Sequence, residues 1–305
     1  MRDITVRVPA KVNLQLAVGP VRPDGFHEIV TVFHAIDIVD DCRVSTGEPG
    51  QGPVLTVSGE GADHVPTDDR NLAWRAAVLV AERTGVAPDV RMHLTKAIPV
   101  AGGMAGGSAD AAAALVACAE LWGTHLDRAD LDALAAQLGS DVTFALHGGT
   151  AIGTGRGEQL TPALVRGTFH WVFALASEGL STPAVYAECD RLRGIGDVLA
   201  PEVSAPLMQA LASGDAAALG SALSNDLQDA AISLRPALGR LIEAGVDLGA
   251  LGGIVSGSGP TCAFLVSDDA RALDIAVGLM STGLCRTVKR GVGPAHGARI
   301  VNGAA

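Results

Sequence analysis

The sequence has no run of basic residues. It has 305 residues, of which 48% are hydrophobic, which is enough for a globular core. Acidic residues outnumber basic ones, 33 to 22, and the formal net charge is -11. A protein that binds nucleic acid needs a basic patch against the phosphates, so the composition argues against nucleic-acid binding. An anionic ligand would have to be held by a local arrangement of donors.

Closely spaced cysteines and long apolar segments are also missing. The five cysteines show no CxxC pair, and no histidines lie at zinc spacing, which argues against a disulfide framework and a metal site; the cysteines are Cys42, Cys118, Cys189, Cys262 and Cys285. The longest apolar run, "AAAALVACAELW", is shorter than the roughly 18 to 20 residues of a membrane span, and the N-terminus lacks the apolar core of a signal peptide. We therefore expect a soluble, cytoplasmic protein with reduced and mostly buried thiols.

Lysine is scarce. Arginine supplies almost all of the positive charge, and the only lysines are Lys11, Lys96 and Lys289. The abundance of Ala, Gly and Arg is typical of a bias toward GC-rich codons. A lysine that persists against such a bias indicates a position where a compact ammonium ion is preferred to a planar guanidinium.

The order of the predicted elements indicates an α+β protein. Residues 1–100 alternate mainly like strands, such as "ITVRV", "VNLQLAV" and "VFHAIDIV", with one helix over "NLAWRAAVLVAERTG". A second helix is predicted from about Ser108 to Trp122. After residue 165 the chain is mostly helical until "TCAFLVS" returns to strand. A chain of this length favours two domains, which we place at residues 1–165 and 166–305.

The stretch "IPVAGGMAGGSADAAAAL", residues 98–115, lies between a predicted strand and a helix N-terminus and is almost free of bulky side chains. Unpaired amides and the positive dipole end at a helix start attract anions, and glycines let a phosphate approach them. Close backbone packing without any ligand explains the same glycines. The stretch matches neither GxxxxGK[ST] nor GxGxxG, so alone it leaves a phosphate cradle and a packing turn as alternatives.

Three further stretches carry polar or small residues. In "PAKVNLQLAVGPVRPDGFHE", Lys11 and Asn13 share one face of a predicted strand, and a turn precedes Phe26 and His27. In "LGSDVTFALHGG", Asp141 is predicted in a turn after a helix, where it could form the turn or, beside a lysine, position a hydroxyl for attack on phosphorus. The last stretch, "GGIVSGSGPTCAFLV", is a Gly/Ser turn that leads into a strand.

In this order, the four stretches resemble the GHMP kinase family of small-molecule kinases. "PAKVNLQLAV" and "RPDGFH" are similar to the opening signature of one branch, and the resemblance runs from Pro9 to about Phe264. It implies an N-terminal domain like domain 2 of ribosomal protein S5, a C-terminal ferredoxin-like domain, and an active site between them. It also implies transfer of the ATP γ-phosphoryl group to the 2-hydroxyl of a cytidine-diphosphate methylerythritol, in the non-mevalonate route to isoprenoids.

The resemblance assigns roles to individual residues. Asp141 would orient or deprotonate the hydroxyl, and Lys11 would keep Asp141 ionised and stabilise charge on the transferred group. His27 would hydrogen-bond the cytosine between the rings of Phe26 and Tyr186. The full set of implied substrate contacts is Asn13, Phe26, His27, Thr182 and Tyr186.

The ATP phosphates would lie on the glycine-rich stretch, and Mg²⁺ would accompany them with Ser108 as a candidate ligand. The implied ATP-binding residues are Pro99, Val100, Ala101, Gly102, Gly103, Met104, Ala105, Gly106, Gly107, Ser108 and Ala109. The family usually reads GLGGGSS here, so Ala105 replaces a glycine and Ala109 a serine; Phe26 stands where tyrosine is usual. Ala105 therefore needs a backbone conformation open to other residues, and the cradle would rely on amides and Ser108.

Two other interpretations stay open. The first is phosphoryl transfer from ATP to a homoserine- or mevalonate-type alcohol; the "RPDGFH" stretch, which is similar to the signature of another branch, argues against it. The second is a catalytically silent nucleotide-binding protein or an RNA-binding module with an S5-like fold. The acidic charge speaks against the RNA-binding form, and the presence of both Lys11 and Asp141 speaks against the silent one. The oligomeric state is left open by the sequence.

Overall fold

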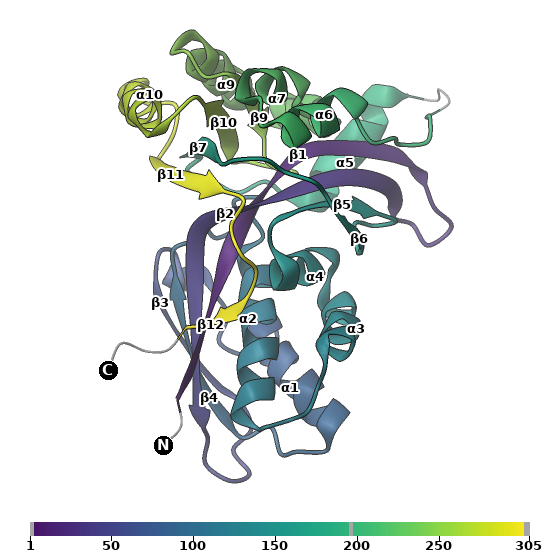
Figure 1. Ribbon diagram of the computed structural model, residues 1–305, viewed down its shortest axis with the longest axis vertical. Coiled ribbons are helices and arrows are strands. Elements are labelled where there is room, and N and C mark those ends of the chain that lie inside the picture. The colour runs from purple at the N-terminus through teal and green to yellow at the C-terminus, as the bar shows by residue number, and fades with distance from the viewer. Residues whose placement is uncertain (1–2, 195–197, 302–305) are drawn as a thin grey trace.

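The computed structural model describes residues 3–194 and 198–301 and contains two sheets (Figure 1). The larger sheet has the order β12-β1-β2-β4-β3, with β5 and β6 attached through β2 and with β8 attached to β1. Its strands are β1 (Ile4–Val21), β2 (His27–Thr46), β3 (Val54–Gly59), β4 (Val90–Lys96), β5 (Thr150–Thr154), β6 (Gln159–Pro162), β8 (Ser224–Asn225) and β12 (Arg299–Ile300). The smaller sheet has the order β11-β7-β10-β9, with β7 (Phe169–Leu175), β9 (Gly252–Val255), β10 (Cys262–Val266) and β11 (Thr287–Gly293).

The described residues contain helices as well as the two sheets, so the α+β class predicted from the sequence is confirmed. The first group comprises the short 3₁₀ helix η1 (Ala62–His64), α1 (Leu72–Thr84), α2 (Gly106–Leu121), α3 (Arg128–Leu138) and α4 (Ser140–His147). The second comprises α5 (Thr182–Arg193), α6 (Ala205–Ser213), α7 (Ala216–Ala222), α8 (Gln228–Leu234), α9 (Ala237–Asp247) and α10 (Asp269–Ser281). None of these helices in the described residues is long and apolar enough to cross a membrane.

Strands β1 and β2 form one long antiparallel ribbon that carries the first site residues. Figure 1 shows it running from the part of the molecule that holds α1 and α2 to the part that holds α6. The sequence pattern predicted shorter strands here, broken near Pro9. The structure instead keeps one strand of 18 residues with register shifts at Pro9/Ala10 and at Asn13/Gln15. At Pro9/Ala10 the ladder skips Asp37 and Ile38 of β2, and such an irregularity accommodates a proline because regular pairing is interrupted there.

Helix α2 is buried on nearly every side and fixes the position of its own N-terminus. Its alanines, from Ala111 to Ala114, are fully buried, and it packs against α1, α4, β1 and β2. Small side chains let all of these elements approach closely, and a helix that is apolar all round is expected to lie in the core. The glycine-rich loop before α2 is therefore held against the β1–β2 ribbon.

The change from the larger to the smaller sheet falls between β6 and β7, and β8 and β12 later return to pair with β1. Glu60, just after β3, also connects the two sheets. Its Oε2 lies 2.5 Å from Nζ of Lys289, which is within β11, and its Oε1 lies 3.1 Å from Nη2 of Arg286, which directly precedes β11. The domain boundary at residues 165/166 stays a prediction. Four of the five cysteines are buried, and Cys285 is partly buried.

Candidate active site

A cavity of about 490 Å³ lies where β1, the loop before α2, the start of α4 and residues 257–258 meet. All four stretches singled out in the sequence contribute to its walls. The predicted site residues that line it are Lys11, Asn13, Pro99, Ala101, Gly102, Gly103, Ala105, Gly106, Gly107, Ser108, Asp141, Thr182 and Tyr186. Tertiary folding thus brings together residues that are up to 175 positions apart in the sequence, from Lys11 to Tyr186.

Lys11 and Asp141 form the charged pair of this cavity. Lys11 Nζ lies 3.9 Å from Asp141 Oδ2 and donates a hydrogen bond of 2.5 Å to Asn13 Oδ1. Asn13 Nδ2 donates in turn to Thr31 Oγ1 at 2.8 Å, and that hydroxyl donates to the Gln15 carbonyl oxygen. Burial lowers the pKa of Lys11, and the Asp141 carboxylate opposes this shift. The relay fixes the ammonium on the predicted face of β1.

Asp141 lies in the first turn of α4, not in an open turn as its surroundings in the sequence predicted. Helix α3 ends and α4 begins around Gly139, whose φ of 154° changes the chain direction. A carboxylate near a helix N-terminus is favoured by the helix dipole. Its side chain is 34% exposed, so Asp141 remains accessible to a hydroxyl substrate.

The glycines of the glycine-rich loop differ in how closely they are packed. A Cβ on Gly103 would lie 2.3 Å from the Ser256 carbonyl oxygen, so Gly103 is needed for close packing. A Cβ on Gly107 would meet only Leu72, at 4.0 Å, so this position faces open space. The hydrogen bond from the Ala109 amide to the Ala105 carbonyl starts the α2 ladder, and the amides of residues 106–108 precede it. Such amides are the donors that bind anions.

Two residues other than glycine in this loop have positive φ. Ala101 has φ 54° and Ala105 has φ 60°, in the left-handed region, which costs a non-glycine residue about 1–2 kcal/mol. Ala105 is also the N-cap of α2 and has no side chain that could accept a helix amide. The resemblance implied that Ala105 replaces a glycine and has a backbone conformation open to other residues; that expectation was wrong, and Ala105 keeps the left-handed conformation that favours glycine. Ala109 is buried, so Ser108 supplies the hydroxyl on the cavity side.

The residues predicted to hold a base lie around β2 and α5. The ring centroids of His27 and Tyr186 are 5.1 Å apart, and burial raises the pKa of Tyr186 to about 12, with a smaller contribution from Asp141. His27 Nε2 lies 2.9 Å from Asp190 Oδ1. Phe26 does not line the cavity described above; it is more than half exposed, and the guanidinium of Arg156 lies 5.1 Å from its ring centroid.

Thr182, the remaining predicted substrate contact, stands at the start of α5. Its Oγ1 lies 2.8 Å from Ser258 Oγ, and both residues line the cavity. This contact joins the start of α5 to the Gly/Ser turn after β9. The fourth stretch therefore contributes a wall of the cavity, although the sequence did not single out Ser258 as a site residue.

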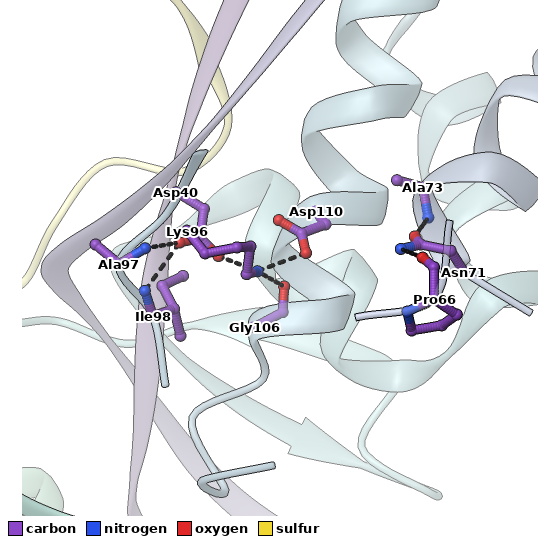
Figure 2. A network of polar contacts seen from close by, with 9 residues as sticks. All are labelled: Asp40, Pro66, Asn71, Ala73, Lys96, Ala97, Ile98, Gly106 and Asp110. Atoms are coloured by element: carbon purple, nitrogen blue, oxygen red, sulfur yellow. Dashed lines mark hydrogen bonds and ion pairs between the residues drawn. The ribbon is translucent and has the colours of Figure 1, made fainter. Parts of the chain in front are cut away.

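The sequence also did not reveal a buried ion cluster behind the loop. Figure 2 shows Lys96, at the end of β4, between the carboxylates of Asp40 and Asp110. All three residues are buried. Burial raises the pKa of Asp110, the Lys96 ammonium opposes that shift, and Asp40 adds to it. The scarcity of lysine was the one sequence signal that pointed to Lys96.

Comparison with known proteins assigns the fold and site to a class. Residues 71–149 match the GHMP kinases N terminal domain, and residues 207–281 match the GHMP kinases C terminal model. A homoserine kinase structure from Cytophaga hutchinsonii superposes with a TM-score of 0.76 at 18% identity, covering 99% of this chain and 98% of the other; at that identity it shows the fold alone. The chain belongs to the GHMP kinase family.

More similar relatives define the branch within this family. The 4-diphosphocytidyl-2-C-methyl-D-erythritol kinase of Mycolicibacterium gilvum is 59% identical over 302 residues, which cover 98% of this chain and 93% of the relative. A crystal structure of a 4-(cytidine 5'-diphospho)-2C-methyl-D-erythritol kinase matches with a TM-score of 0.75 and 31% identity, over 98% of this chain and all of the other. The branch that "RPDGFH" predicted is thereby confirmed.

Proposed function

We propose that this protein transfers the γ-phosphoryl group of ATP to the 2-hydroxyl of 4-diphosphocytidyl-2-C-methyl-D-erythritol, giving the 2-phosphate and ADP. This is a step of the methylerythritol phosphate route to isoprenoid precursors. The observation that carries the proposal is the position of the Lys11–Asp141 pair in the same cavity as the glycine-rich loop. A carboxylate able to accept a hydroxyl proton thus lies opposite a loop suited to phosphates.

Asp141 performs the proton transfer. The 2-hydroxyl of the substrate donates a hydrogen bond to a carboxylate oxygen of Asp141, and its oxygen attacks the γ-phosphorus. The hydroxyl proton passes to Asp141 while the bond from the γ-phosphorus to the β–γ bridging oxygen breaks and ADP leaves. Because phosphoryl transfer depends mainly on positioning and on charge stabilisation, the orienting contact matters as much as the basicity of the carboxylate.

Lys11 supplies a fixed positive charge next to the reacting groups. Its ammonium is buried, and its bond to Asn13 holds it in one orientation, so no reorganisation is needed when negative charge develops. Asn13 acts here through Lys11, and its role as a direct substrate contact remains part of the proposal.

The phosphates of ATP lie on the loop of residues 99–109, against the amides at the start of α2. Among the described residues, no three His, Cys, Asp or Glu side chains form a metal cluster. Mg²⁺ that arrives with ATP needs only one or two protein oxygens, because phosphate oxygens and water supply the rest. The Ser108 hydroxyl on this cavity fits that requirement. When bound, Mg²⁺ neutralises charge on the β and γ oxygens.

The cytidine end of the substrate lies toward α5 and the turn after β1. Tyr186 offers a ring face for stacking, and His27 offers a ring nitrogen for hydrogen bonding to the base. Phe26, whose ring is more than half exposed and lies beside Arg156, supplies the second ring of the sandwich. Thr182 contributes a hydroxyl on the same side of the cavity.

ADP release by the purified protein tests this function. With ATP and Mg²⁺, we expect release that depends on the cytidylyl substrate, and the phosphorylated product should carry the new phosphate on the 2-oxygen in ³¹P NMR spectra. Homoserine and mevalonate in the same assay give the comparison for other acceptors. Faster turnover of either alcohol would contradict the acceptor, and nucleotide binding without any ADP release would contradict the kinase function.

A further inference from the structure

The buried cluster of Lys96, Asp40 and Asp110 saturates the lysine ammonium. Lys96 Nζ donates to Asp40 Oδ2 and to Asp110 Oδ2, and its third contact is the Gly106 carbonyl oxygen at 3.3 Å. An ammonium has three protons, so these three acceptors use all of them. Lys96 therefore has no proton left for a nucleotide, and any effect on ATP must pass through the groups that it holds.

Those groups are the two ends of the phosphate loop, as Figure 2 shows. At the N-terminal end of the loop, here called its entry, Asp40 Oδ1 accepts hydrogen bonds from the backbone amides of Ala97 at 2.6 Å and of Ile98 at 2.8 Å. At the C-terminal end, here called its exit, Lys96 donates to the carbonyl oxygen of Gly106, the first residue of α2, and to the Asp110 side chain within α2. One ion cluster thus ties down both ends of the loop against β2.

The loop between these ties needs such support. Ala101 and Ala105 are in the left-handed region, and residues in unfavourable backbone conformations persist only where their surroundings determine them strongly. The other described side-chain or backbone ties within the loop are single hydrogen bonds. The Lys11 amide donates to the Met104 carbonyl at 3.3 Å, and Ser256 Oγ donates to the Gly103 carbonyl at 3.1 Å.

Stability alone gives no reason to keep three charges in the core. Replacing a buried ion pair by well-packed apolar residues is often neutral or stabilising, because the desolvation of the charges is costly. What apolar residues cannot do is accept the Ala97 and Ile98 amides or hold the Gly106 carbonyl. We propose that Lys96, together with Asp40 and Asp110, is a positioning group that sets the geometry of the phosphate loop for ATP. This rests on the proposed kinase function.

Two substitutions test the contacts of Lys96 with Asp40 and with Asp110 one at a time. In Asp40→Asn, one side-chain oxygen can still accept the loop amides, but an NH₂ group then faces the Lys96 ammonium. We expect the dissociation constant for a non-hydrolysable ATP analogue to rise about 10- to 100-fold, the effect of a misplaced loop. In Asp110→Asn the ion pair is lost but an amide oxygen can still accept a hydrogen bond from Lys96, so we expect a change below about threefold, because the contact to α2 is kept.

A third variant guards against a failure of Asp40→Asn to fold. Lys96→Met combined with Asp110→Leu removes one positive and one negative charge, so the net charge is unchanged, and it leaves Asp40 bonded to Ala97 and Ile98. This variant frees the exit of the loop and removes the ammonium from Asp40 Oδ2, while Asp40 Oδ1 still accepts the amides at the entry. We expect it to fold and to bind the ATP analogue about tenfold more weakly or worse, because the Gly106 tie is lost.

The control is Leu279→Ala, which leaves a cavity in the core of the smaller sheet and lowers stability far from the loop. Binding is measured by titration calorimetry without the alcohol, at a temperature where all variants are folded, followed by kinetics. We expect weaker analogue binding and a higher KM for ATP in Asp40→Asn and in the double variant, an unchanged KM for the cytidylyl substrate, and near-normal constants in Asp110→Asn and in the control.

Equal analogue affinities in the wild type, Asp40→Asn and the double variant would overturn the positioning role and leave the kinase function intact. A change in both KM values to the same extent would also overturn it, because that is the result of general misfolding. A wild-type protein that does not bind the analogue would instead overturn the kinase function and the positioning role together.

Discussion

Replacing Asp141 by asparagine keeps the shape of the side chain and removes its charge. In the structure this carboxylate lies 3.9 Å from the Lys11 ammonium. At about 4 Å the attraction of two unit charges is about 4 kcal/mol at an effective dielectric constant of 20 and about 1 kcal/mol in water. Because Asp141 is about one-third exposed, the lower part of this range applies. Most of the effect on turnover therefore comes from the lost proton acceptor.

Loss of a positioned base typically slows a reaction about 10²- to 10⁴-fold, and we expect kcat of Asp141→Asn to fall within or beyond that range. The residual activity should also change with pH. Burial lowers the pKa of Lys11 and Asp141 opposes this, so removing Asp141 lowers that pKa further. The ammonium is then lost at lower pH, and the basic limb of the pH–rate profile should move to lower pH.

Turnover is measured as ADP release at saturating concentrations of both substrates, and binding as titration of the ATP analogue. We expect analogue binding within about threefold of the wild type, since the phosphate loop is untouched and only a surface-accessible charge is lost. Asp132→Asn, on α3 beside His147, is the matched control and should turn over normally. A near-normal kcat of Asp141→Asn would refute the role of Asp141 in the chemistry.

Three further predictions concern the base, the loop and the connection between the sheets. Tyr186→Ala should raise KM for the cytidylyl substrate by one to two orders of magnitude, roughly the value of a stacked base, and leave KM for ATP unchanged; equal changes would contradict stacking. Ala105→Gly should raise the free energy of unfolding by up to about 1 kcal/mol in urea titrations, because left-handed strain is relieved although the unfolded chain gains freedom; a clear loss would contradict the strain. Burial raises the pKa of Glu60, but Lys289 and Arg286 lower it more, and the net shift is downward. The Glu60 carboxylate therefore stabilises the fold at pH values above its unfolded pKa, and this contribution is lost as the pH falls through its folded pKa. We expect Glu60→Gln to have a lower Tm than the wild type at pH 7 and the same Tm in strong acid.

Much of the fold could be predicted because its local signals are strong. The helix predicted over "NLAWRAAVLVAERTG" forms as α1 and ends at Gly85, and the helix predicted from about Ser108 to Trp122 forms as α2. The length of β1 could not be predicted, because Pro9 is a local strand breaker whose cost is removed by a bulge against β2. The helical start at Asp141 was missed because α4 is short and begins directly after α3.

The candidate site divides in the same way. The sequence pointed to Lys11, Asn13 and the glycine-rich loop because polar residues at alternate strand positions and a stretch without bulky side chains are visible along the chain. Asp40 and Asp110 were not assigned to a site, since an aspartate in a strand and one in a helix look ordinary until both meet Lys96 in the core. The contact between Arg156 and Phe26 also joins residues whose pairing has no signal in the sequence.

The sequence by itself determined the class of chemistry, because ordered motifs and residue types, such as the lysine on a strand and the amides at a helix start, are local properties of the chain. Only the tertiary structure decided which charges meet. It placed Lys11 3.9 Å from Asp141, and it enclosed Lys96 between Asp40 and Asp110, in contact with the start of α2. Such meetings depend on how β1, β2, β4, α2 and α4 pack, because the energy of a charge depends on its distance and burial and not on its position in the sequence.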